Sequence, residues 1–153
     1  MTVGIIQAHT DAVLTLLRAA PPAPPFEPLP IYPGEVPDYL ADGSGGPADL
    51  YCLVYMTLTT PYGTALTNAS DRGVLQIITH SVSGNTKTDG SSTSAQIVAQ
   101  RVRAALLDVV PVVTGRACFP IRQELGPPVQ RDEKAGPKVY DQVDLWRLET
   151  VPG

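Results

Sequence analysis

The alternation of apolar and polar positions predicts two helices. Between residues 3 and 20, apolar side chains return every three or four positions, as on one face of a helix. Pro21 ends this segment because proline has no backbone N–H to donate. A second helix is expected to begin at Thr93, whose spacing to Gln96 matches a capping box, and to close before Pro111. Its apolar stripe consists of Val98, Val102, Ala105, Leu106 and Val109.

Strands are predicted where apolar residues recur with a period of two. The segments are residues 50–58, 73–82, 117–125 and 139–150. The order helix, strand, strand, helix, strand, strand, without an internal repeat, predicts a single α+β domain over residues 1–153. Its antiparallel or mixed sheet is expected to have about four strands and to be covered by the two helices.

The last predicted strand is apolar on both of its faces. Val143 and Leu145 fall on one face, and Trp146 and Leu148 fall on the other. We therefore expect one face of the sheet to contact the helices and the other to contact a partner.

A segment rich in proline and glycine, residues 21–47, separates the first helix from the first strand. It carries eight prolines between Pro21 and Pro37, with apolar side chains interleaved, which favours extended backbone. We expect a strap that crosses the domain or a neighbouring subunit, with a free linker or a ligand for peptide-binding modules as alternatives. The turn at residues 42–47 lacks the Gly-Lys-Ser/Thr ending of a phosphate-binding loop.

Composition narrows the classes of function. Charged residues make up only 17% of the chain, which favours an assembly subunit weakly, and a net charge of -4 disfavours nucleic-acid binding as the main task. No apolar run approaches the ~20 residues that cross a bilayer, and no signal peptide is recognisable, so we expect a cytosolic protein without membrane association. Cys52 and Cys118 are then expected to be buried thiols, with a disulfide or metal pair as the alternative.

The sequence offers little for catalysis. His9 and His80 are the two histidines, and neither has a convincing partner by spacing, so both are expected to be structural. Asp141 and Asp144 are three apart on a strand and should point to opposite faces. Nucleophile elbows, zinc signatures and dinucleotide glycine patterns are absent from the sequence, so we predict no enzyme, cofactor or metal. A small hydrolase that uses His80 with a carboxylate brought close by folding is the alternative.

Several phrases of the sequence resemble the tail terminator, or tail completion, family of siphophages. They are the first helix ending in Ala19-Ala20-Pro21, the strands Ala48-Asp-Leu-Tyr-Cys-Leu-Val-Tyr55 and Val74-Leu-Gln-Ile-Ile-Thr-His-Ser-Val82, the helix Ala95-Gln-Ile-Val-Ala-Gln-Arg-Val-Arg-Ala-Ala-Leu-Leu107, and Tyr140-Asp-Gln-Val-Asp-Leu-Trp-Arg-Leu148. The resemblance implies a structural protein of the virion, assembled in the host bacterial cytoplasm. It further implies a hexameric ring that caps the tail tube, stops its polymerisation and presents a joining surface to the head.

By this resemblance, the partners are further copies of the chain, the major tail tube protein and the head completion or connector protein, and DNA passes through the ring without specific binding. Another neck protein, such as a head completion or connector adaptor protein, is the alternative in the same class. Loops and two residues of the last strand are expected to contact partners. They are Tyr62, Asn68, Asp71, Arg72, Asn85, Lys87, Asp89, Trp146 and Arg147. For Trp146 a place in the core is the competing interpretation.

Overall fold

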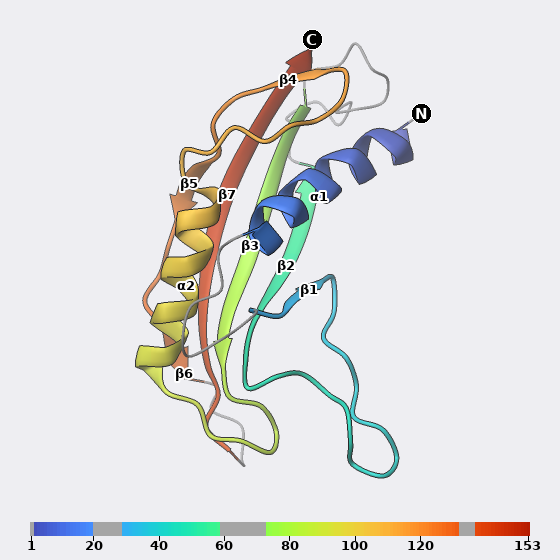
Figure 1. The fold of residues 1–153 in the computed structure, drawn as a ribbon. Helices are drawn as coiled ribbons and strands as arrows, with labels where there is room; N and C mark the ends of the chain where they lie inside the picture. Colours follow the sequence, from blue (N-terminus) through green and yellow to red (C-terminus); the bar gives the residue numbers. More distant parts are fainter. Residues whose placement is uncertain (1, 20–28, 59–72, 132–136) are drawn as a thin grey trace.

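The computed structural model describes residues 2–19, 29–58, 73–131 and 137–153 (Figure 1). Its helices are α1 (Thr2–Ala19) and α2 (Ser92–Leu106). Its strands are β1 (Ile31–Pro33), β2 (Leu50–Leu58), β3 (Gly73–Ser83), β4 (Arg116–Cys118), β5 (Arg122–Leu125), β6 (Gln130–Arg131) and β7 (Tyr140–Pro152). Both predicted helices are confirmed, and the mixed α+β class is confirmed with them.

One mixed sheet joins the described strands in the order β1-β2-β3-β7-β4. β1 runs parallel to β2, and the other neighbours run antiparallel. β5 and β6 also pair with β7, so β4, β5 and β6 follow one another along the edge of β7 that faces away from β3. The sheet therefore has seven strands where the sequence predicted about four.

The additional strand β1 lies inside the proline-rich segment that was predicted to be a strap. Its neighbours Pro30 and Gly34 bind β2, through bonds of 2.9 Å from Cys52 N to Pro30 O and from Gly34 N to Val54 O. Pro33 is tolerated because β1 is an edge strand, which has one side without a neighbouring strand. The first part of the predicted strap, residues 21–28, lies outside the described residues.

The predicted strand over residues 117–125 is divided into β4 and β5. Pro120 lacks an N–H, and Ile121 turns away from β7 to bind the segment that follows α2. Ile121 N donates to Val109 O at 2.9 Å, and Ile121 O accepts from Asp108 N at 2.8 Å. The Ile121 side chain is fully buried, so core packing stabilises the interruption of the ladder.

Helix α2 begins at a different cap from the one predicted. The N-cap is Ser91, whose hydroxyl accepts from Ser94 N at 3.1 Å, so the capping box at Thr93 and Gln96 is wrong. The helix ends at Leu106, before Pro111.

The core lies between the sheet and the two helices. Figure 1 shows α1 and α2 on the same side of the sheet, which we call the inner face. The buried residues there come from α1, α2, β2, β3 and β7, and they include Val13, Leu17, Val98, Val102, Leu106, Cys52, Val54, Leu75, Ile77, Trp146 and Leu148. Burial of each large aliphatic side chain contributes roughly 1.5 to 3 kcal/mol to folding.

Candidate functional site

No described helix covers the other side of the sheet, which we call the outer face (Figure 1). The strand registers align apolar side chains across β2, β3 and β7 on this face. They are Tyr51, Leu53, Tyr55, Ile78, Val82, Val143 and Leu145, and Leu125 of β5 extends the row. Leu125 and Tyr55 are exposed, whereas Tyr51 and Val82 are buried. An apolar sheet face of this extent is a candidate surface for association.

His80 lies in the middle of the outer face and contacts a carboxylate. Its Nδ1 is 2.8 Å from Oδ2 of Asp141, and its ring meets the Tyr55 ring edge to face with centroids 5.8 Å apart. The hydrogen bond to Asp141 raises the pKa of His80, although partial burial acts in the opposite direction. Spacing along the chain does not indicate this pair, because Asp141 is 61 residues away from His80.

The His80 and Asp141 pair is the arrangement that the hydrolase alternative requires. The adjacent hollow, of about 330 Å³, is lined by Tyr51, Leu53, His80, Val82, Gln130, Arg131, Val139 and Asp141. These described residues include no serine, threonine or cysteine to act as a nucleophile. Burial raises the pKa of Tyr51 to about 12, which keeps its hydroxyl protonated at neutral pH. The pair joins β3 to β7 through a side-chain hydrogen bond.

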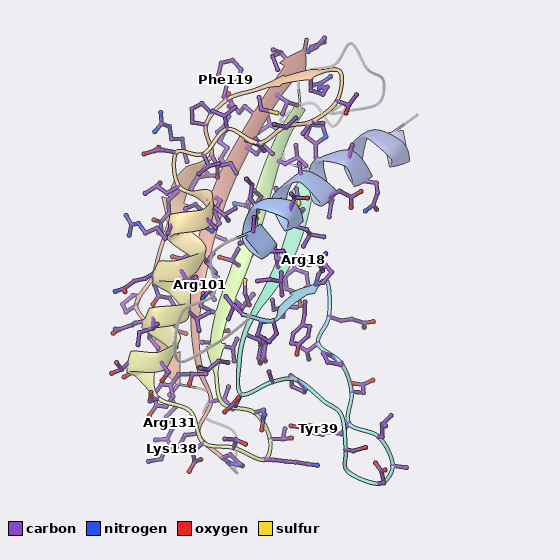
Figure 2. All side chains as sticks on the ribbon, viewed as in Figure 1. Arg18, Tyr39, Arg101, Phe119, Arg131 and Lys138 are labelled. Carbon is purple, nitrogen blue, oxygen red and sulfur yellow. The ribbon has the colours of Figure 1, made fainter. Side chains whose placement is uncertain are left out.

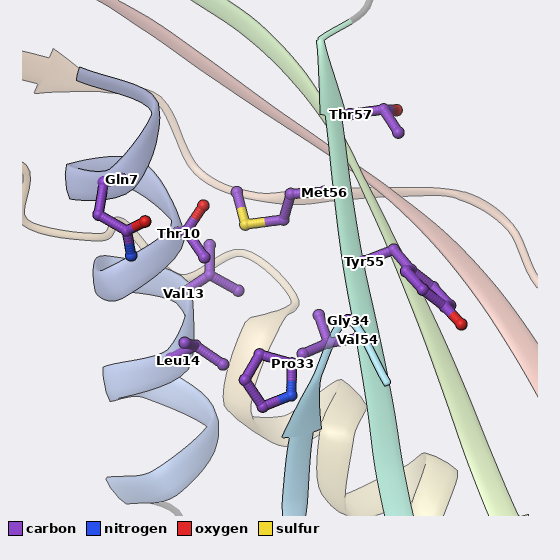
Figure 3. A pocket seen from close by; sticks show the side chains of 10 residues that line it. All are labelled: Gln7, Thr10, Val13, Leu14, Pro33, Gly34, Val54, Tyr55, Met56 and Thr57. Atoms are coloured by element: carbon purple, nitrogen blue, oxygen red, sulfur yellow. The ribbon is translucent and has the colours of Figure 1, made fainter. Parts of the chain in front are cut away.

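A second candidate surface is an apolar groove between α1 and the end of β1 (Figure 3). It has a volume of about 430 Å³, and it is lined by Gln7, Thr10, Val13, Leu14, Pro33, Gly34, Val54, Tyr55, Met56 and Thr57. Figure 3 shows Met56 pointing toward α1, while Tyr55 and Thr57 lie on the opposite side of β2. β1 ends opposite Val54, so no described strand pairs with Met56 on this edge of β2. We call this site the α1–β2 groove.

A third surface is an exposed apolar loop at the opposite edge of the sheet, beside β4. Val110, Val112 and Phe119 are 52%, 88% and 49% exposed, and we call these three residues the apolar loop. Figure 2 places Phe119 near β4. In the sequence, the valines around Pro111 indicate only a helix end, and their alternation carries no sign that Val110 and Val112 are exposed.

The predicted contact residues have different outcomes. Tyr62, Asn68, Asp71 and Arg72 lie outside the described residues. Three others make contacts within the chain, between the turn at residues 84–90 and neighbouring loops. Asn85 donates to Pro47 O at 3.1 Å, Lys87 lies over the Tyr39 ring and donates to Gly43 O, and Asp89 accepts from Lys138 N at 2.6 Å. These bonds fix the turn, and whether it meets a partner stays a prediction.

The two predicted contact residues of β7 separate onto opposite faces. Trp146 is 0% exposed, and its Nε1 donates to Thr79 Oγ1 at 3.0 Å, so the geometry supports the core interpretation of this residue. Arg147 is exposed, and it forms an ion pair of 2.6 Å with Glu149. Only Arg147 is placed where a partner could contact it.

The sequence also predicted the surroundings of His9, of the two cysteines, and of Asp141 and Asp144. His9 is buried, with Nε2 2.8 Å from Thr150 Oγ1, which confirms a satisfied core histidine. Cys52 and Cys118 are free thiols; Cys52 is buried as expected, whereas Cys118 is only partly buried, and burial raises the pKa of Cys52 to about 12. Asp141 and Asp144 do lie on opposite faces, and Asp144 accepts from Gln123 Nε2 at 2.9 Å on the inner face. Burial raises the pKa of Asp144.

The described residues contain no group of three or more His, Cys, Asp or Glu side chains arranged to hold a metal ion. Neither described helix has the length and apolarity needed to cross a membrane.

These features define a small α+β protein whose described residues form an apolar outer face, the α1–β2 groove and the apolar loop. No protein-family model matches the chain, and no curated protein matches it. Among solved structures, a chain described as "Virion of native gene transfer agent (GTA) particle" is similar, with a TM-score of 0.53 and 16% identity. The similarity covers 99% of this chain and 98% of that one. A second solved structure, whose name states no function, has a TM-score of 0.50 and 19% identity over 100% of this chain and 99% of its own. At these identities the likeness concerns the fold.

Proposed function

We propose that the chain is a structural protein of a phage-like virion, and within that class the tail terminator. The observation that carries the proposal is the end-to-end fold likeness to a chain from a gene transfer agent virion. The resemblance of the sequence to tail terminators supports the finer assignment. In this role, copies of the chain close into a ring, expected to be hexameric, on the end of the tail tube.

The surfaces of the subunit suit a ring. A cyclic ring joins one patch of each subunit to a different patch of the next, so each subunit needs two distinct contact surfaces. The α1–β2 groove and the apolar loop lie at opposite edges of the sheet and supply such a pair. The outer face then remains available for the tail tube or the head connector. A net charge of -4 suits a lumen through which DNA passes without being bound.

Deletion of the gene in a producing strain tests the proposal. Without a terminator, tube growth has no stop at its head-proximal end, so electron micrographs should show tails of abnormal and variable length without heads. A plasmid copy of the intact chain should restore uniform length. Tails of normal length that carry heads would contradict the proposal.

The same micrographs separate the terminator from a neck adaptor. An adaptor acts after the tube has reached its length, so its deletion should give tails of normal length that fail to join heads. That outcome would keep the virion class and replace the finer assignment.

The contact between His80 and Asp141 is the observation that favours a hydrolase as a second candidate. His80→Ala should abolish turnover of ester and phosphoester model substrates while tail assembly continues, if the hydrolase assignment is right. We expect the opposite result, in which the purified chain shows no turnover that depends on His80.

A further inference from the structure

We propose that the apolar loop of one subunit inserts into the α1–β2 groove of the next copy, and that this contact forms the ring. The inference rests on the proposed function and names the residues of the contact. It joins Val110, Val112 and Phe119 at the β4 edge to a groove at the β1–β2 edge.

The apolar loop is held in a fixed conformation before any partner binds. Pro111 and Val113 are buried, so the side chains on either side of Val112 attach the loop to the domain. Backbone bonds from Ile121 N to Val109 O at 2.9 Å and from Arg116 N to Val113 O at 3.0 Å brace its two ends. Val112 is 88% exposed on a loop that is already fixed, so its binding costs little additional conformational entropy, which favours association.

The groove has the chemistry to accept aliphatic side chains. Its floor is made of Val13, Leu14 and Val54, which are buried, and Met56 forms one wall (Figure 3). The volume of about 430 Å³ leaves room for side chains of valine or phenylalanine size. The adjoining edge of β2 at Met56 has no partner among the described strands, so main-chain groups there can also bind an incoming segment.

The charges near the two surfaces are complementary. Asp11 on α1 and Glu35, next to Gly34, flank the groove, and residues 7–14 and 33–38 contain no lysine or arginine. Residues 108–122, which include the apolar loop, contain Arg116, Arg122 and one acidic residue, Asp108, so this segment has a net positive charge. A second copy of the chain therefore matches the groove in both apolarity and sign of charge.

The test compares Val112→Asp with Leu40→Asp, because Leu40 is also exposed, at 63%, and lies in a different loop. Assembly is followed by sedimentation and native mass spectrometry of the purified chain, and by electron microscopy of rings on tail ends. We expect Val112→Asp to melt like the unaltered chain, but to need about a tenfold or larger increase in concentration to assemble. Leu40→Asp should assemble normally.

The groove has a matched pair of variants on the same helix. Thr10→Trp fills the groove, whereas Thr15→Trp places the same ring on an exposed part of α1 that does not line it. Only Thr10→Trp should block assembly. A mixture of Val112→Asp and Thr10→Trp chains retains one intact loop and one intact groove, so it should give dimers that do not grow into rings.

Normal assembly of Val112→Asp or of Thr10→Trp, or a mixture that stays monomeric, would overturn the contact. A chain that is monomeric at its highest soluble concentration and forms no ring on tail ends would overturn it too. Occupation of the groove by another segment of the same chain or by the tail tube protein would appear as normal rings from Val112→Asp. Abnormal tails from the gene deletion would still support the proposed function in each of these cases, so the two ideas fail separately.

Discussion

The two faces of the sheet use the same three long strands in different ways. On the inner face, β2, β3 and β7 contribute side chains that the helices bury completely, among them Ile77 and Trp146. On the outer face, the same strands place Leu53, Ile78 and Leu145 in a row that no described helix covers. The alternation of apolar residues therefore predicts which residues share a face of the sheet, but it does not predict what covers that face.

The largest expected effect concerns the helix that covers the inner face. Val102 is 1% exposed under α2, so Val102→Asp leaves an unpaired charge in the core and should cost about 3 to 5 kcal/mol of unfolding free energy. Chemical denaturation measures this loss. Ile97→Asp, on the exposed side of the same helix, should cost less than about 1 kcal/mol. Similar losses for both variants would show that α2 does not cover the core through this stripe.

A medium effect contrasts neighbouring residues of β7. Trp146→Phe removes the bond to Thr79 Oγ1 and leaves a void on the inner face, so it should cost about 2 kcal/mol. Leu145→Ala, on the outer face, should cost about 1 kcal/mol or less because that residue is only partly buried. Thermal melting of both variants, together with Thr79→Val in a double-mutant cycle, checks the contrast. An equal cost at both positions would contradict the difference between the faces.

The smallest expected effect is electrostatic and lies on the outer face. The bond to Asp141 raises the pKa of His80 above 6.5, so the folded chain holds this proton to higher pH than the unfolded chain does. Its contribution to stability is complete below the unfolded pKa and is lost as pH rises through the folded pKa. Proton NMR titration should show a lower pKa for His80 in Asp141→Asn and no change in Glu149→Gln. A His80 pKa that does not respond to Asp141→Asn would show that the contact is absent in solution.

Long elements with a strong pattern could be predicted from the sequence. β2 was predicted at its observed bounds, and both ends of α1 and the start of α2 were predicted to within one residue. The end of α2 was predicted too late, and its N-cap residue was wrong. The cap was missed because Ser91, Ser92, Thr93 and Ser94 all carry hydroxyls, and tertiary contacts select Ser91: its N–H donates to Ser83 Oγ at 3.0 Å. The pattern therefore predicts the element, and neighbouring segments select its first residue.

Short strands and contacts across the sheet could not be predicted. β1 and β6 have three and two residues, too few to show a period, and they exist because β2 and β7 present open edges. The contact of His80 with Asp141 depends on the register between β3 and β7, which no local pattern encodes. The apolar loop was read only as a helix end, because its exposure follows from the buried side chains of Pro111 and Val113.

The central position of β7 has a consequence for how the protein is made. The ribosome synthesises β3, β4, β5 and β6 before it reaches β7, the strand with which all four pair. While β7 is still in the exit tunnel, β3 on one side of it cannot be joined to β4, β5 and β6 on the other. Folding of the sheet is therefore a late event dominated by contacts distant in sequence, which slows it, and the nascent chain presents unpaired strand edges until then.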